Sequence, residues 1–214
     1  EFIKHVKYSE ENSKYKIKLD RSALFLTFNY TNTLERLYNI NKDQITYIHN
    51  SISGTLPIVL GHGIDPETFE DKPILPPSGL SNQQLDQWLD ENDTYDYAYD
   101  TGKDNLIRYF RDTYKPSQEI MRKHRQWFNN LNAIKEVHVY GHSISSVDIP
   151  YFAEIVNNVP IQTLWTVSYY DDNEKVRLLD SLTALGIKGT NISFIELIDI
   201  EEMGDQLNLN LNSL

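Results

Sequence analysis

The chain has 214 residues, of which 40% are hydrophobic, and this is enough apolar surface to bury one sizeable core. It has no cysteine, which excludes disulfides and thiolate metal sites and suits a reducing, cytoplasmic compartment. The formal net charge of -11 repels phosphate backbones, and no apolar stretch approaches the roughly 18 residues of a membrane span, so the sequence disfavours nucleic-acid and membrane partners.

The first half of the chain predicts strands that end in polar residues. Residues 1–21 are interpreted as a charged N-terminal segment before a single α/β domain over 22–214. The apolar run 22–28 predicts a strand covered on both faces, and it ends at Asn29. A helix is predicted over 33–38, where Asn32 and Glu35 have the spacing of a capping box. The next predicted strand, 44–48, ends at His49.

A helical insertion is predicted in the middle of the chain. A third apolar run, 57–60, predicts another strand and is followed by Gly61-His62-Gly63. After Gly63 the alternation of strands and helices stops, and a proline-rich loop leads into segments rich in aromatic and charged residues. We interpret residues 66–133 as a helical subdomain or cap inserted into a parallel sheet.

The α/β alternation returns with the most informative stretch of the chain. A strand over 136–140 is followed by the turn Gly141-His142-Ser143 and a helix near 150–157. Such a turn brings backbone N–H groups to the carboxyl edge of a sheet, where α/β proteins bind phosphates and sugars. Asp148 has the position of a helix N-cap, and we favour that structural role for its side chain. Further strands are predicted over 161–168 and 192–197, with a helix over 173–185 that Gly186 ends.

These turns predict a site at one sheet edge. If the strands ending at residues 28, 48 and 140 are parallel neighbours, then Asn29, His49 and Gly141 lie together. Against this stands the ordinary reading that each polar residue only satisfies the backbone where its strand ends. A site role further predicts that His49→Ala abolishes function with little loss of stability.

Five motifs in order give a family resemblance. They are residues 26–35, Ile48-His49, 60–63, 141–150 and 165–170. In this order they resemble the AbiH-type bacteriophage abortive-infection family, over about residues 22–197. That family is similar to the sirtuin-like NAD-binding fold, which implies a Rossmann-like parallel sheet with flanking helices. Both families begin with a strand and a glycine-rich loop that nothing before residue 22 resembles, so we expect a C-terminal piece or trimmed chain that lacks them.

The resemblance implies defence against phage, with cleavage of the nicotinamide–ribose bond of NAD or of a related nucleotide and no metal ion. Asn29 would position a water molecule and His49 would accept a proton from a ribose hydroxyl. The sequence departs from the sirtuin-like pattern at Asn29-Tyr30-Thr31 and at Asn50, where a glycine is usual. The other residues implied to bind the ligand are Thr27, Tyr30, Thr31, Ser51, His62, Gly141, His142, Ser143 and Asp148.

Other functions stay open at this point. The same edge could bind a nucleotide without catalysis, or the insertion could recognise a phage component. A toxin directed at RNA is disfavoured by the acidic charge. The expected partners are thus a nucleotide, a phage component or both, and a homo-oligomer is compatible with the sequence.

Overall fold

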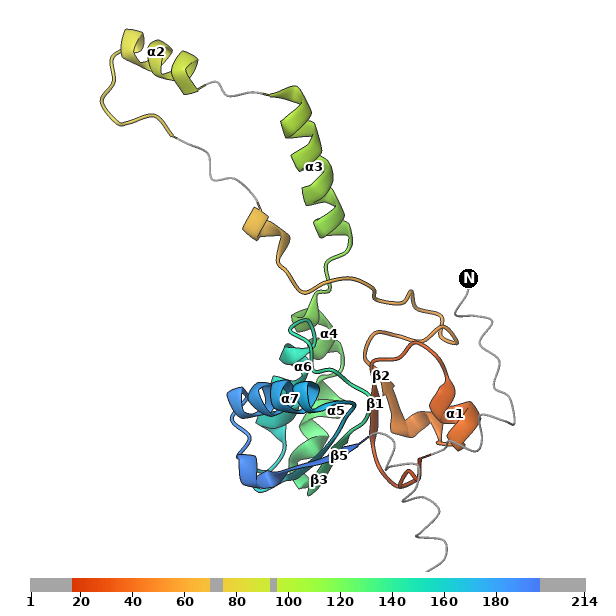
Figure 1. The fold of residues 1–214 in the computed structure, drawn as a ribbon. Helices are drawn as coiled ribbons and strands as arrows, with labels where there is room; N and C mark the ends of the chain where they lie inside the picture. The colour runs from red at the N-terminus through yellow and green to blue at the C-terminus, as the bar shows by residue number, and fades with distance from the viewer. Residues whose placement is uncertain (1–16, 70–74, 93–95, 197–214) are drawn as a thin grey trace, which may run out of the picture. The chain divides into compact units, whose positions relative to one another are not determined.

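The computed structural model describes residues 17–69, 75–92 and 96–196, and the chain divides into two compact units (Figure 1). The first unit comprises Glu1–Val59 and Pro116–Leu214, and the second comprises Leu60–Lys115. Most of the predicted charged segment 1–21 lies outside the described residues.

The first unit begins with a parallel pair of short strands. β1 (Phe25–Thr27) pairs with β2 (Ile45–Tyr47), and Leu26 lies opposite Thr46. Between them, α1 (Thr33–Tyr38) has the predicted bounds, and a short 3-10 helix, η3 (Lys42–Gln44), leads into β2. The predicted capping box does not form, because Asn32 makes no side-chain capping hydrogen bond and Glu35 instead accepts one from the Tyr47 hydroxyl.

A three-stranded parallel sheet forms the rest of the α/β alternation (Figure 1). Its strands lie in the order β3 (Glu136–Val139), β4 (Leu164–Tyr169) and β5 (Ile192–Glu196). They are connected by α6 (Ile149–Asn158) and α7 (Asp172–Ala184), which supply the buried side chains of Tyr151, Phe152, Ile155, Leu178 and Leu182. After α7 and a short 3-10 helix, η6 (Gly189–Asn191), the chain enters β5. Gly186 has a φ of 93°, as predicted for the end of α7.

The sheet arrangement corrects two predictions. Among the described residues β3 pairs with β4 and not with β1 or β2, so the expected single edge is divided between two sheets. No strand forms over residues 57–60, where the Val59 N–H donates to the carbonyl oxygen of His49 instead of joining a ladder. An apolar run of this length needs a neighbouring strand to pair with, and the run alone does not reveal whether one is present.

Three helical segments that fall within the predicted insertion pack into the first unit. They are α4 (Ser117–Lys123), α5 (Arg125–Asn129) and the 3-10 helix η5 (Asn130–Ala133). Their side chains Ile120, Met121, Phe128 and Leu131 join the hydrophobic core with α6 and β4. The second unit therefore ends at Lys115, before the predicted end at residue 133. None of the helices that the structure describes is long and apolar enough to cross a membrane.

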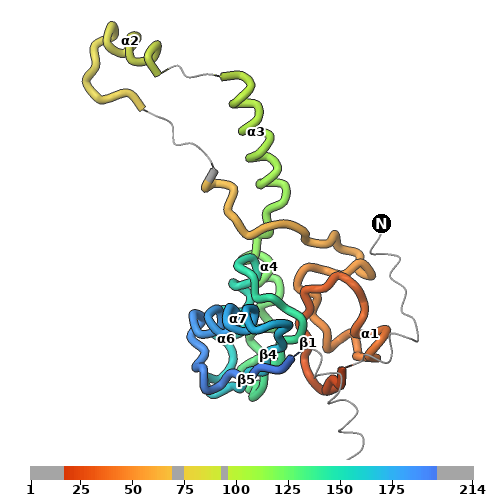
Figure 2. Tube along the Cα trace, in the orientation of Figure 1, coloured from red at the N-terminus to blue at the C-terminus, as the bar shows by residue number. Residues whose placement is uncertain are grey.

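The second unit contains η4 (Pro66–Phe69), α2 (Asn82–Asn92) and α3 (Tyr97–Asp112). No residue of α2 or α3 is buried. The segment that enters the second unit, at His62, lies beside the segment that leaves it, at Tyr114 (Figure 2). The His62 N–H donates to the Thr113 carbonyl at 2.9 Å, and the Lys115 N–H donates to the His62 carbonyl at 2.8 Å. We call Gly61–His62 with Thr113–Lys115 the neck. At Gly61, a Cβ atom would lie 1.7 Å from the Thr113 carbonyl oxygen.

Candidate functional site

Strand ends from both sheets of the first unit meet around one phenylalanine. Phe28 follows β1, and its ring centroid lies 4.3 Å from that of His142 and 5.6 Å from that of His49. The same ring contacts Tyr151 and Phe152 of α6, at 5.7 and 5.9 Å. We call Phe28, His49, His142, Tyr151 and Phe152 the aromatic cluster. It brings together segments that lie more than 100 positions apart in the chain, which the sequence predicted for His49 and the turn at Gly141.

His49 is buried inside this cluster. Only 2% of the residue is exposed, and its ring meets the edge of Tyr151 at 5.5 Å and lies 6.4 Å from the ring of Tyr30. Truncating a buried ring leaves a cavity, so His49→Ala lowers stability as well as removing the imidazole. The prediction that this change would spare stability is therefore wrong, and a size-conserving substitution is needed to test function.

His142 is held in one orientation by its own turn. The Ile144 N–H donates to His142 Nδ1 at 2.9 Å, so the neutral ring carries its proton on Nε2. Nε2 lies 3.6 Å from Asp148 Oδ2, and the two side chains are 16% and 15% exposed. Ile144 has a φ of 47°, in the left-handed region that β-branched residues rarely adopt. Such strain gathers at functional sites, where the surrounding structure holds it in place.

Asp148 lies at the N-cap position of α6, with proline in the first turn, but its side chain makes no capping hydrogen bond. Its Oδ2 accepts from the Ser145 hydroxyl at 3.0 Å instead. Its Oδ1 is buried and has no hydrogen-bond partner within the described part of the chain. The favoured capping role for this side chain is therefore wrong, and the carboxylate is directed to other partners.

The Asp148 carboxylate contributes to raised pKa values of two tyrosine hydroxyls. Burial raises the pKa of Tyr30, and the negative charge of Asp148 raises it further. For Tyr151, burial is again the largest cause of a raised pKa, a hydrogen bond to Ser117 opposes it, and Asp148 adds to it. Both phenols therefore keep their protons at neutral pH. The Tyr30 hydroxyl donates to the Val59 carbonyl oxygen at 3.1 Å.

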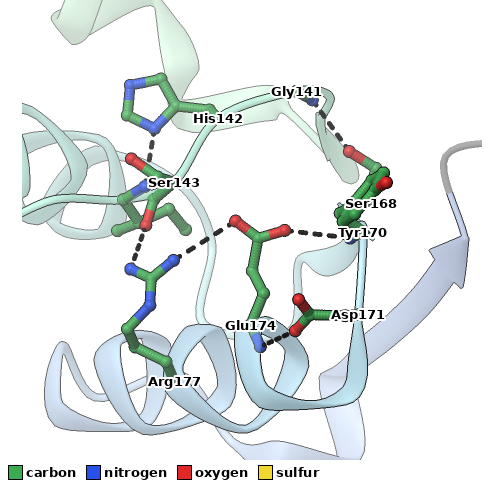
Figure 3. Close-up of polar contacts among 9 residues, drawn as sticks. Gly141, His142, Ser143, Ser168, Tyr170, Asp171, Glu174 and Arg177 are labelled. Carbon is green, nitrogen blue, oxygen red and sulfur yellow. Dashed lines mark hydrogen bonds and ion pairs between the residues drawn. The ribbon is translucent and has the colours of Figure 1, made fainter.

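Hydrogen bonds connect the turn after β3 to the start of α7 (Figure 3). The Gly141 N–H donates to Ser168 Oγ at 2.8 Å, so this amide has a protein partner and is not free for a phosphate as the turn motif suggested. Arg177 donates to the Ser143 carbonyl oxygen at 2.8 Å and also pairs with Glu174 at 3.3 Å. The guanidinium is half-exposed, and its positive charge lies beside the turn in an ion pair with Glu174.

Four other predicted residues lie at the end of β1 or in nearby loops, outside the aromatic cluster. Asn29 is exposed, and its backbone N–H donates to Thr27 Oγ1 at 3.1 Å. The Thr31 hydroxyl lies 2.8 Å from that of Thr33, and the Ser51 hydroxyl donates to the Tyr30 carbonyl oxygen at 3.3 Å. These bonds are those expected of residues that stabilise turns, and a catalytic role for Asn29 stays a prediction.

The remaining predicted residue, His62, belongs to the second unit. Its Nδ1 accepts from the Ile64 N–H at 3.1 Å, and its ring lies 4.7 Å from that of Phe110. Within residues 17–69, 75–92 and 96–196, no three His, Asp or Glu side chains gather closely enough to hold a metal ion.

Sequence reasoning missed several residues at the site. The sequence did not single out Phe28, Tyr151 and Phe152, because an aromatic ring in a strand or helix gives no sign that it faces a histidine. Arg177 gave no signal at all, since its partner Ser143 lies 34 positions earlier in the chain.

One comparison with known proteins is informative. The family model described as "Bacteriophage abortive infection AbiH" matches residues 1–169, which include β1 to β4 and the whole aromatic cluster. No curated protein and no solved structure matches the chain. The match covers more than three quarters of the 214 residues and agrees with the five ordered motifs. The chain therefore belongs to the AbiH family of bacteriophage abortive-infection proteins.

Proposed function

We propose that this protein defends bacteria against phage by binding a nucleotide at the aromatic cluster. It acts in the cytoplasm and cleaves the nicotinamide–ribose bond of NAD or of a related nucleotide. The family supports the defence role. The observation that carries the site is that Phe28, His49 and His142, from three separate stretches of chain, meet ring against ring, with Asp148 beside His142.

The chemistry of the cluster suits this reaction. Breaking the bond between ribose and nicotinamide develops positive charge on the sugar, which a nearby carboxylate such as Asp148 stabilises. An imidazole such as that of His49 can accept a proton from a ribose hydroxyl near neutral pH. The Tyr151 phenol keeps its proton and can donate to a ligand. The choice of NAD rests on the sirtuin-like resemblance, and Asn29 as the residue that positions water belongs to the same proposal.

The test is nicotinamide release from NAD by the purified protein, alone and after addition of lysate from phage-infected cells. We expect release by the unchanged protein and its loss in His49→Gln, which keeps most of the side-chain volume. His138→Gln is the matched control, because His138 is an exposed histidine on β3 outside the cluster. The hydrolase proposal is wrong if the unchanged protein releases no nicotinamide in either condition, or if His49→Gln releases it normally.

A sensing role for the second unit is the second candidate. The observation that favours it is α3, which buries no residue and exposes Tyr97, Tyr99, Leu106 and Tyr109. Exposed tyrosine and leucine side chains on a helix that buries no residue suit a protein-binding surface, here one for a phage protein.

The neck allows this role to be tested separately. Residues 64–112 can be replaced by a short Gly-Ser linker, since the backbones at His62 and Thr113 already lie side by side. The shortened protein should still bind nucleotide but should lose protection of cells against phage. If protection survives the deletion, the second unit is not the sensor.

A further inference from the structure

One oxygen of the candidate site has no partner that the described protein supplies. Asp148 Oδ1 is buried, while Oδ2 of the same carboxylate accepts from Ser145 and lies near His142. Buried carboxylate oxygens are nearly always hydrogen-bonded, because removing them from water without a partner is unfavourable. Such an acceptor is available to a hydrogen-bond donor on a ligand.

We propose that Asp148 Oδ1 accepts a hydrogen bond from a ribose hydroxyl, so that the site selects ribonucleotides over 2′-deoxyribonucleotides. This inference rests on the nucleotide-binding part of the proposed function and names the group that reads the sugar. It makes Asp148 a specificity-determining residue.

The local charge favours a neutral donor at this position. Burial chiefly, and the negative charge of Asp148 in addition, disfavour the ionised form of the Tyr30 and Tyr151 phenols. A phosphate placed here would meet the same repulsion, whereas a hydroxyl supplies a proton without adding negative charge. The sugar therefore lies at Asp148.

The phosphates are then directed toward Arg177. Its guanidinium donates to the carbonyl oxygen of Ser143, in the turn that leads to Asp148, and it is half-exposed. Guanidinium groups bind phosphate well because they offer several N–H donors in one plane. One turn thus presents a carboxylate for the sugar and is contacted by an arginine of α7 for the phosphates.

The carboxylate is held firmly enough to discriminate. The Ser145 hydroxyl donates to Oδ2 of Asp148 at 3.0 Å. His142 Nε2 lies 3.6 Å from the same oxygen, and the Ile144 N–H holds the His142 ring in place. A site built to bond a hydroxyl rejects the analogue that lacks it, because the buried acceptor then stays unpaired. For a hydrogen bond to a charged group, the expected loss of affinity is roughly 10- to 100-fold.

The experiment measures the dissociation constants of NAD and of its analogue with 2′-deoxyribose next to nicotinamide, by calorimetry on the full chain. The unchanged protein should bind the deoxy analogue roughly 10- to 100-fold more weakly. Asp148→Ala should bind both equally, at the weaker level. Asp171→Ala is the matched control, because Asp171 is also an N-cap aspartate but bonds the Glu174 N–H of its own helix. It should keep the discrimination.

The outcomes separate the two proposals. Equal binding of both ligands by the unchanged protein overturns the role of Asp148 but leaves nucleotide binding intact. The same conclusion follows if Asp148→Ala still binds the deoxy analogue more weakly than NAD. Binding of neither ligand overturns both proposals. The comparison of two ligands on the unchanged protein needs no variant, so it decides the matter even if Asp148→Ala does not fold.

Discussion

Replacing Phe28 by alanine should destabilise the first unit far more than the same change at a comparable phenylalanine. Phe28 is half-buried, yet its ring contacts four other rings, which come from the end of β2, the turn after β3 and α6. Buried Phe→Ala changes cost about 3–5 kcal/mol, and partial exposure lowers that figure while aromatic pairs add to it. We expect a loss of about 3 kcal/mol for Phe28→Ala.

Phe194 provides the matched comparison. It is also a half-buried phenylalanine, on β5, but among the described residues its ring contacts one other ring, that of Tyr169 at 6.2 Å, with Lys175 5.9 Å away. We expect about 1.5 kcal/mol for Phe194→Ala. Urea unfolding followed by circular dichroism gives both free energies. Equal losses for the two variants would refute the conclusion that Phe28 joins the two sheets of the first unit.

Three further predictions concern the neck, the buried phenols and the two N-cap aspartates. Gly61→Ala should open the neck, because the new Cβ would overlap the Thr113 carbonyl oxygen, and faster hydrogen exchange of the neck amides would show it. Because burial raises the pKa of Tyr151 above its ordinary 10.0, the folded chain keeps a proton that the unfolded chain releases. Stability should therefore fall as the pH rises past about 10, and Tyr151→Phe should reduce that fall in thermal unfolding measured against pH. Asp171→Ala should cost about 1 kcal/mol in urea unfolding through loss of its cap. Asp148→Ala removes no capping bond but breaks the hydrogen bond from Ser145 to a largely buried carboxylate beside His142, so it should cost at least as much; a clearly smaller loss at Asp148 would contradict that hydrogen bond.

Local patterns predicted the secondary structure of the first unit well. The helix over 33–38 has the predicted bounds, and α6 and α7 begin and end within one residue of the predicted ranges. Strand, turn and helix signals act over a few neighbouring residues, so they can be read directly from the chain. The predicted strand over 57–60 failed because a strand needs a partner, and pairing depends on residues far away in sequence.

The candidate site was predicted only in part for the same reason. The position of His49 after a strand and the turn at Gly141 are local features, and the structure places the rings of His49 and His142 beside that of Phe28, while their role in a site stays a prediction. The direction of the Asp148 side chain depends on Ser145 and His142 rather than on the helix that follows it, so the N-cap pattern was misleading. The boundary of the insertion was placed too late because α4 and α5 look like its helices until their apolar faces are seen in the core.

The neck has a consequence for how this protein can evolve. Its two hydrogen bonds join backbone atoms, so they do not depend on which side chains the bonded residues carry. Residues 64–112 can therefore change in length and composition while the chain leaves and re-enters the first unit along the same path, provided that residue 61 stays glycine. If the second unit recognises a phage protein, as proposed, its recognition surface lies on a segment that can be altered or exchanged without rebuilding the core. The neck makes residues 64–112 such a segment.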